Sequence, residues 1–415
     1  MSKYPSKTFY ENIKKFLGYK YPSKTFCIYP WTHIAVTASG NLRLCCEADN
    51  ILARSMPLQV MSSKPYKIYE DSIADAWHSQ YYQQVREKML NGEQPAPCSN
   101  CYLNEKNNIY STRARSNTQY MFDIEQSATP PMHIKYLDLR LGNLCNLKCR
   151  MCFPSASSKW AEDWPVERRW PGQVDEGYDW PEHPYVWEQL EPFLDTVEKI
   201  YLTGGEPTLT PGCNTLYEIC IEKDVAKNIV LSVTTNLTNI PEKLVGYWKH
   251  FKKVEIGGSI DAYGKLNRYI RHPSNWNMID KNLRKWIDIS KEHPTIFLER
   301  TNTTVQMYNI LNLSELLDYF EEIQSLTSIS IKSNFFLVTW PPEFNIHLLP
   351  KELKELATNR LHKYNQKEVQ DIISYMHRKD SSDEFITFVK STNDLDKKRS
   401  ENLFDLVPEY KQYFL

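Results

Sequence analysis

The chain has 415 residues, of which 41% are hydrophobic and 24% charged, so it is a globular protein long enough for two or three domains. Its net charge of -1 gives no electrostatic reason to expect nucleic acid or an anionic membrane as a partner. The first 20 residues carry charges throughout, and no later run reaches the roughly 18 apolar residues of a membrane span. We therefore expect a soluble, cytoplasmic protein with no nucleic-acid or membrane partner.

Residues 1–130 contain many turns, short strands at best and one helical run at 71–90. Such a segment cannot bury much apolar surface by itself and would gain stability from a cross-link. Half of the ten cysteines lie in it, at positions 27, 45, 46, 98 and 101. In a chain without an export signal, clustered thiols indicate metal binding or catalysis more often than disulfides.

From residue 133 onward, short β-rich apolar runs alternate with longer amphipathic stretches. This alternation predicts a parallel sheet with crossover helices, either open or curled into part of a barrel. In such sheets the functional loops follow the carboxyl ends of the strands. The predicted strands are 134–141, 198–205, 228–235, 253–260, 295–302 and 328–336.

We expect three domains: 1–130, an α/β domain at 131–345, and a charged, helical C-terminal extension at 346–415 that docks on the rest. Residues 160–187 hold five of the eleven tryptophans and four prolines, and we expect a lid or a packed surface flap there. Cys213 and Cys220 fall on an expected helix and are interpreted as buried core residues.

Cys145, Cys149 and Cys152 follow the first predicted strand of the α/β domain, in the sequence CNLKCRMC. Three thiolates from one loop can hold three irons of a cubane iron–sulfur cluster and leave the fourth iron open. A structural zinc loop would need a fourth cysteine or histidine close by, and none follows.

This loop resembles the cluster-binding motif of the radical SAM superfamily, although Met151 stands where the family commonly has an aromatic residue. The sequence TGGEP at 203–207 is similar to the family's motif that meets the amino group of S-adenosylmethionine (SAM). There Gly204 and Gly205 would permit close backbone approach, and Glu206 would accept a charged hydrogen bond. The resemblance implies a partial (β/α)6 TIM-like barrel, SAM and a [4Fe-4S] cluster as cofactors, and an electron donor such as flavodoxin or ferredoxin.

The resemblance also implies roles for polar residues after the later strands. Asn236 would face the cofactor, and Ser259 and Asp261 would lie near its ribose. Arg271 would meet its carboxylate with a bidentate guanidinium, with Arg268 as the alternative. Solvated polar groups of loops and helix starts are the alternative interpretation for each of them.

The front of the chain resembles the SPASM and shorter twitch modules, which carry auxiliary clusters, although in better-known members the module follows the barrel. Gly40, separated from Cys45 by four residues, belongs to this pattern, as does the segment 72–101. The resemblance implies that one auxiliary [4Fe-4S] cluster is held by Cys27, Cys45, Cys98 and Cys101. Cys46 is the alternative to Cys45, and structural zinc is the alternative to iron.

The resemblance thus implies an enzyme that cleaves SAM to a 5′-deoxyadenosyl radical, which abstracts hydrogen from a substrate. Because relatives with auxiliary modules often act on peptides, we expect a peptide or protein side chain as the substrate. A small metabolite such as an amino sugar, nucleoside or cofactor precursor is the alternative, since no separate leader-binding domain is recognisable. A non-catalytic, zinc-binding scaffold is a third hypothesis. The sequence names no catalytic acid, base or radical relay.

Overall fold

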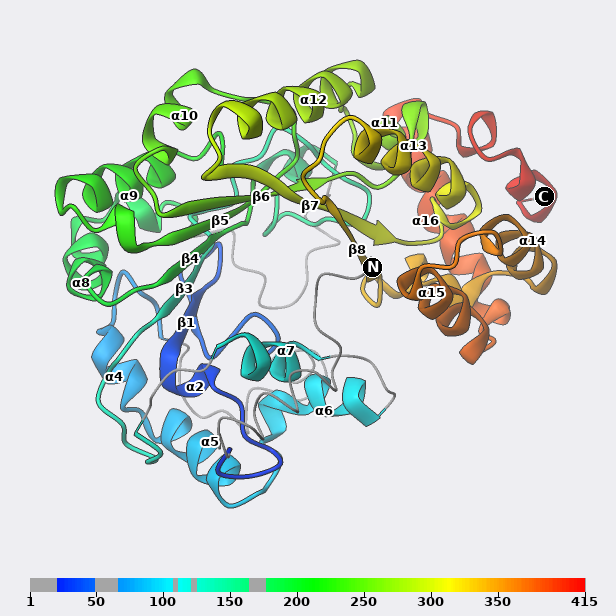
Figure 1. Cartoon of the computed structure of the whole chain (residues 1–415). Helices are drawn as coiled ribbons and strands as arrows, with labels where there is room; N and C mark the ends of the chain where they lie inside the picture. The colour runs from blue at the N-terminus through cyan, green and yellow to red at the C-terminus, as the bar shows by residue number, and fades with distance from the viewer. Residues whose placement is uncertain (1–20, 49–65, 107–110, 121–124, 164–176, 415) are drawn as a thin grey trace. The chain divides into compact units, whose positions relative to one another are not determined.

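The computed structural model describes residues 21–48, 66–106, 111–120, 125–163 and 177–414 (Figure 1). The chain divides into two compact units: Met1–Arg140 with Gly177–Tyr201, and Leu141–Glu176 with Leu202–Leu415. These boundaries differ from those of the three predicted domains, because the first strands of the α/β alternation group with the front of the chain. The C-terminal extension groups with the second unit.

The sheet of the first unit has the strand order β2-β1-β3-β4. Its strands are β1 (His33–Val36), β2 (Leu42–Arg43), β3 (Tyr136–Leu139) and β4 (Lys199–Leu202). β1 pairs antiparallel with β2 and parallel with β3, with His33 opposite Tyr136. The turn from β1 to β2 needs a glycine, because Gly40 has a φ of 78° and a Cβ there would lie 2.7 Å from Cε1 of Tyr69.

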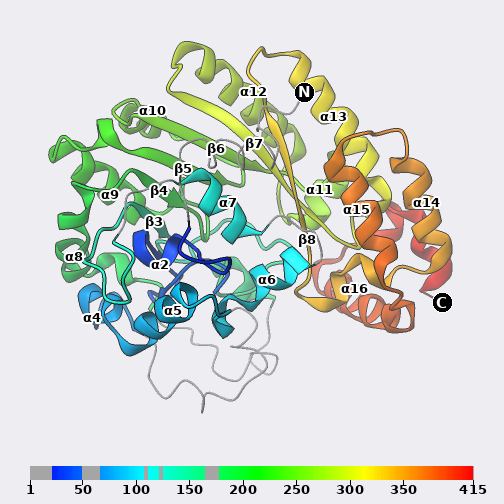
Figure 2. The ribbon, with the colours of Figure 1, turned by 60° about the horizontal axis from the view of Figure 1, so that its bottom comes forward.

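In the first unit, α2 lies beside α5 (Figure 2). The predicted helical run at 71–90 is confirmed, but it forms two helices because the Ser79 side chain accepts the N–H of Tyr82 and starts a new one. The α-helices are α2 (Tyr29–Thr32), α4 (Ile73–Trp77), α5 (Gln80–Leu90), α6 (Ser99–Lys106), α7 (Thr112–Gln119) and α8 (Pro184–Leu194). Short 3-10 helices span Ala96–Cys98 and Trp180–Glu182.

The sheet of the second unit is parallel throughout, in the order β5-β6-β7-β8. Its strands are β5 (Val230–Thr235), β6 (Lys253–Ser259), β7 (Ile296–Val305) and β8 (Lys332–Leu337). With β3 and β4, they account for all six predicted strands, each displaced by a few residues at most. The predicted α/β class, a parallel sheet with crossover helices, is therefore confirmed.

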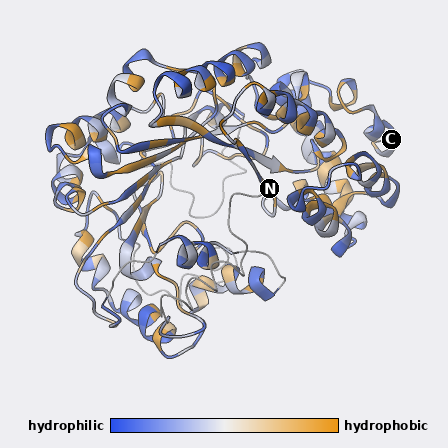
Figure 3. Cartoon of the chain, viewed as in Figure 1, coloured by the Kyte–Doolittle hydropathy of each residue, from blue (hydrophilic) through white to orange (hydrophobic). Residues whose placement is uncertain are grey.

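Amphipathic helices follow the strands of the second unit. In α12, Ile279, Leu283 and Trp286 are buried, whereas much of the helix is hydrophilic (Figure 3). The α-helices are α9 (Pro211–Glu222), α10 (Glu242–Trp248), α11 (Gly264–Ile270), α12 (Trp276–Glu292), α13 (Leu313–Ser325), α14 (Lys351–Leu361), α15 (Lys367–Arg378) and α16 (Phe385–Arg399). The 3-10 helices are Ser158–Glu162, Ala226–Asn228, Ile310–Asn312, Pro342–Phe344, Ile346–Leu348, Ser382–Glu384, Leu403–Asp405 and Pro408–Tyr413.

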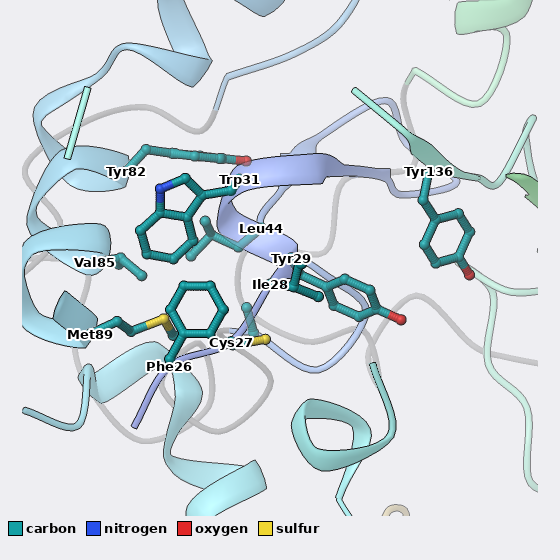
Figure 4. Close-up of a cluster of buried hydrophobic side chains, with 11 residues drawn as sticks. Phe26, Cys27, Ile28, Tyr29, Trp31, Leu44, Tyr82, Val85, Met89 and Tyr136 are labelled. Carbon is teal, nitrogen blue, oxygen red and sulfur yellow. The ribbon is translucent and has the colours of Figure 1, made fainter. Parts of the chain in front are cut away.

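A cluster of buried side chains in the first unit holds the segment that carries Cys27. Figure 4 shows Trp31 and Phe26 packed beside Val85 and Met89 of α5, and the rings of Phe26 and Trp31 are 4.9 Å apart. Among the described helices, none is long and apolar enough to cross a membrane. Cys213 and Cys220 are buried in α9, as predicted. Part of the predicted flap, 164–176, lies outside the described residues.

Candidate metal centres

The loop with the three closely spaced cysteines lies directly after β3 in the sequence and makes main-chain contacts to two distant segments. The N–H groups of Lys148 and Arg150 donate to the carbonyls of His272 and Ile270, at 2.7 and 2.8 Å. The carbonyl of Leu144 accepts the N–H of Glu206 at 2.7 Å. The loop therefore takes its shape from the TGGEP segment and from the end of α11.

The structure brings the three predicted thiols of this loop together. The thiols of Cys149 and Cys152 interact, which lowers the pKa of Cys149 to about 7 and raises that of Cys152. Burial raises the pKa of Cys145 to about 11. The charge of Cys149 raises this pKa further, whereas the charge of Arg271 lowers it. Thiols that gather in this way, from one short loop, fit the donor set of a cluster with an open iron.

Arg271 lies beside these thiols, whereas Arg268 is exposed near the end of α11. The guanidinium of Arg271 donates from Nη1 to Asp261 at 2.8 Å, and its Nε is buried with no hydrogen-bond partner among the described residues. Burial lowers its pKa, but the charges of Cys149 and Asp261 outweigh this and raise it. A buried cation with an unused donor can bind a carboxylate next to the thiols.

The two predicted ribose-proximal residues have different surroundings. Asp261 is fully buried, and its carboxylate accepts hydrogen bonds from Arg271 and from the N–H of Thr304 at 2.7 Å. Ser259 is half-buried at the end of β6, opposite Asn302 of β7. Asp261 therefore orients Arg271, and contact of either residue with a ribose stays a prediction.

Asn236 follows β5 and lies next to the first thiol. Its Nδ2 is 3.9 Å from Sγ of Cys145 and 2.9 Å from Oδ1 of Asn146. Its own Oδ1 accepts the N–H of Thr238 at 2.9 Å, which fixes the orientation of the amide. An amide N–H aimed at a ligating sulfur is a contact that tunes an iron–sulfur centre.

The TGGEP segment requires both glycines. Gly204 and Gly205 have φ values of 80° and 51°, and a Cβ on Gly205 would lie 2.3 Å from the carbonyl oxygen of Leu144. The backbone of this segment therefore approaches the cysteine loop more closely than any other residue type would permit.

Glu206 is buried, and its carboxylate binds groups of the protein itself. Oε1 accepts hydrogen bonds from the hydroxyls of Thr208 and Thr235, both at 2.7 Å, and Oε2 accepts the N–H of Asn236 at 2.6 Å. Burial raises its pKa against these hydrogen bonds. Glu206 thus ties the TGGEP segment to the end of β5, and its predicted contact with the cofactor amino group stays a prediction.

Four thiols of the first unit line one cavity. They belong to Cys27, Cys45, Cys98 and Cys101, the four residues predicted from the sequence; Cys46 is not among the lining residues. Burial raises the pKa of the Cys27 and Cys45 thiols, and it raises the pKa of Cys101 to about 12. A metal must therefore displace protons to bind these three thiols. In the described ranges no group of His, Cys, Asp or Glu side chains is arranged around a single metal ion.

Side chains from α7, which the sequence did not indicate, position this cavity. Asn117 accepts the N–H of Ile28 at 2.8 Å and donates to the carbonyl of Phe26 at 2.7 Å, so it fixes the residues on both sides of Cys27. Arg113 donates to the same carbonyl at 2.7 Å. Glu47, two residues after Cys45, accepts from Asn100 at 2.8 Å and so connects the β2 segment to α6.

Two family models match the chain: that of the radical SAM superfamily over residues 139–323, and that of the SPASM iron–sulfur cluster-binding domain over residues 27–102. Residues 139–323 thus match a radical SAM domain, and residues 27–102, ahead of them, match a SPASM domain. The resemblance predicted from the sequence is confirmed, including the order of the two domains. Domains of these two families imply radical chemistry with SAM and [4Fe-4S] clusters.

Known proteins with similar sequence or structure differ widely from this chain. Uncharacterized protein MJ0907 of Methanocaldococcus jannaschii is 26% identical over 242 residues, which cover 56% of this chain and 72% of MJ0907. Native anSMEcpe with bound AdoMet has a TM-score of 0.38 and 16% identity, over 58% of this chain and 62% of its own. Streptococcus suis SuiB bound to S-adenosylmethionine has a TM-score of 0.34 and 18% identity, over 69% of this chain and 64% of its own. The match spans less than two thirds of the length of these two solved chains.

Proposed function

We propose that this radical SAM enzyme cleaves SAM reductively and uses the resulting 5′-deoxyadenosyl radical to abstract hydrogen from its substrate. The observation that carries the proposal is the gathering of the three thiols of one loop beside the unused donor of Arg271 and the amide of Asn236. Three soft ligands and an adjacent carboxylate-binding cation are what a cluster with an open iron and an amino-acid cofactor need.

Each residue has a role in this proposal. Cys145, Cys149 and Cys152 would hold three irons of a [4Fe-4S] cluster. When bound, the cluster and SAM supply the electron and the carbon–sulfur bond whose cleavage yields the radical. Arg271, oriented by Asp261, would bind the SAM carboxylate.

The remaining predicted residues would complete the SAM site. Gly204, Gly205 and Glu206 would form its amino-group side, and Ser259 would lie near the ribose. Asn236 would donate a hydrogen bond to the sulfur of Cys145, to which its amide already points.

We also propose that Cys27, Cys45, Cys98 and Cys101 hold an auxiliary [4Fe-4S] cluster. Their arrangement around one cavity supports this assignment and favours Cys45 over Cys46. The match to a SPASM domain supports a peptide or protein side chain as the substrate. We propose flavodoxin or ferredoxin as the electron donor. A cluster with four thiolates has no open iron and would accept the electron that an oxidised product leaves behind.

Anaerobic purification with iron, sulfide and zinc analysis tests these assignments together. We expect about eight irons per chain and little zinc, and 5′-deoxyadenosine when SAM and a reductant are added. Zinc with negligible iron would overturn the proposal in favour of a scaffold. For the substrate, we expect a mass change in a candidate peptide that accompanies deoxyadenosine formation; a change in small metabolites alone would contradict it.

A further inference from the structure

Arg150, between the second and third cysteines of the loop, is a fully buried cation. Its guanidinium lies 3.5 Å from the centre of the Tyr269 ring, and its Nε donates to the Tyr269 carbonyl at 3.0 Å. A charge buried to this extent requires partners of opposite sign, because desolvation of an isolated ion is strongly unfavourable.

Those partners come from the C-terminal end of α16, about 250 residues further along the chain. Nη2 of Arg150 pairs with Asp396 and, at 2.7 Å, with Glu401. Each carboxylate also contacts the end of α11 or the residues just after it: Asp396 accepts from the Tyr269 hydroxyl in α11 at 2.7 Å, and Glu401 lies 2.7 Å from Nδ1 of His272. Both carboxylates therefore connect the cysteine loop to the segment that carries Arg271.

A second group of contacts joins the same C-terminal turn to the start of the loop. Arg399 donates to the carbonyl of Lys148 at 2.8 Å and pairs with Asp163 at 2.6 Å. Asp163 also pairs with the Lys148 side chain at 2.9 Å. The residues that flank Cys149 on both sides are thus bound to one helix end.

We propose that residues 396–401 form a clamp that sets the distance between the cysteine loop and Arg271, and that Arg150 is its central positioning residue. The proposal rests on the proposed function, since it assigns the clamped elements to the cluster and to the SAM carboxylate. The loop has no helix or strand of its own at 141–152, so these contacts replace regular secondary structure. A reaction that depends on orientation needs the cluster ligands and the group that binds the cofactor to be held in one fixed geometry.

A purely stabilising role would be served as well by apolar residues, because replacement of buried ion pairs by packed hydrophobic groups is often neutral or favourable. Buried charges instead impose directional partners. Here the partners of the buried charges lie on the cysteine loop and on the segment that carries Arg271, whose relative positions must stay fixed.

The first test uses thiol alkylation of the metal-free full-length chain, so it does not depend on the cluster. We compare the parent with Glu401→Gln and Asp396→Asn, and follow Cys149 and Cys152 by mass spectrometry. We expect both variants to raise the alkylation rate of these thiols at least about tenfold, because the loop opens more often. Rates equal to those of the parent would overturn the clamp, whether or not the protein proves to be a radical SAM enzyme.

Glu409→Gln is the matched control. Glu409 pairs with Arg360, a contact within the same C-terminal extension that does not involve the cysteine loop. We expect this variant to alkylate Cys149 at the parental rate. An increase as large as that of Glu401→Gln would show that loss of any C-terminal ion pair loosens the loop, and would contradict the proposal.

The second test separates positioning from stability in the cluster-loaded protein. We compare EPR spectra of the reduced protein with and without SAM for the parent, Arg150→Lys and Arg150→Met. We expect the SAM-dependent spectral change to be smaller in Arg150→Lys, which keeps the charge but cannot reach both carboxylates, and smallest in Arg150→Met. An identical change in all three would overturn the proposal. If Arg150→Met does not fold, Arg150→Lys and Glu401→Gln decide the outcome.

Discussion

The four thiols of the first unit come from three separate segments, whereas the three thiols of the second unit lie within eight residues of one loop. The first group surrounds a cavity and is held by Asn117 and Arg113 of α7, which lie 87 to 89 positions from their partners beside Cys27. The second group is held by strand ends and by a helix end far along the chain. Close spacing of the thiols in the sequence therefore does not make a site local, because the compact loop depends on side chains from distant parts of the chain just as the dispersed set of thiols does.

Serine substitutions in the two groups should separate their roles most clearly. We expect Cys149→Ser to reduce 5′-deoxyadenosine formation by about a thousandfold or more, since an iron loses its ligand, and to leave about four irons. Cys98→Ser should also leave about four irons but should retain most SAM cleavage without substrate. Iron analysis and deoxyadenosine chromatography measure both. Full SAM cleavage by Cys149→Ser would contradict the assignment.

The close approach of the TGGEP segment to the cysteine loop predicts a large effect of one added methyl group. Gly205→Ala should lower the free energy of unfolding by about 3 kcal/mol or more, because φ is 51° and the new Cβ would lie 2.3 Å from the Leu144 carbonyl. Gly246→Ala is the control, since no atom lies within 4 Å of its Cβ position in α10, and it should stabilise by about 0.5–1 kcal/mol. Denaturant unfolding measures both, and equal effects would contradict the steric argument.

Asp138 of β3 gives the first unit a pH dependence. Burial raises the pKa of its carboxyl to about 6, although Arg140 and Arg43 oppose this, and Oδ1 has no hydrogen-bond partner among the described residues. The folded chain thus holds this proton more tightly than the unfolded chain does. Its contribution to stability is present below about pH 4 and is lost as the pH rises through 6.

Asp138→Asn removes that titration. We expect the variant to gain about 3 kcal/mol over the parent at pH 7 and almost nothing at pH 4, as measured by denaturant unfolding at both values. A gain that does not depend on pH would show that the carboxylate is not the cause.

The smallest effect concerns the residue of α7 that holds Cys27. Asn117→Ala removes two hydrogen bonds to the main chain and should lower the free energy of unfolding by about 2 kcal/mol. It should also reduce the auxiliary iron content. Gln119→Ala, at an exposed position of the same helix, should change neither quantity. Auxiliary iron at the parental level in Asn117→Ala would contradict the positioning role of α7.

The sequence was most informative where the signal is local. The strands follow from apolar runs, and the cysteine loop follows from its spacing, so their positions could be predicted to within a few residues. The α7 contacts of Asn117 and the pairing of Arg150 with Asp396 and Glu401 could not, because single polar residues 89 to 251 positions apart leave no periodic pattern. Glu206 was expected at the cofactor because of its motif. The four hydrogen bonds that its carboxylate accepts from Thr208, Thr235 and Asn236 could not be predicted, because two of them come from the end of β5.

The parallel pairing of β1 with β3 has a consequence for work on the separate domains. Without the first 130 residues, β3 would keep its neighbour β4 but would expose a row of unpaired N–H and C=O groups on the other side. Such an edge recruits strands from other molecules. A shortened chain that begins at β3 should therefore aggregate on expression, even though it contains the whole segment that matches the radical SAM model.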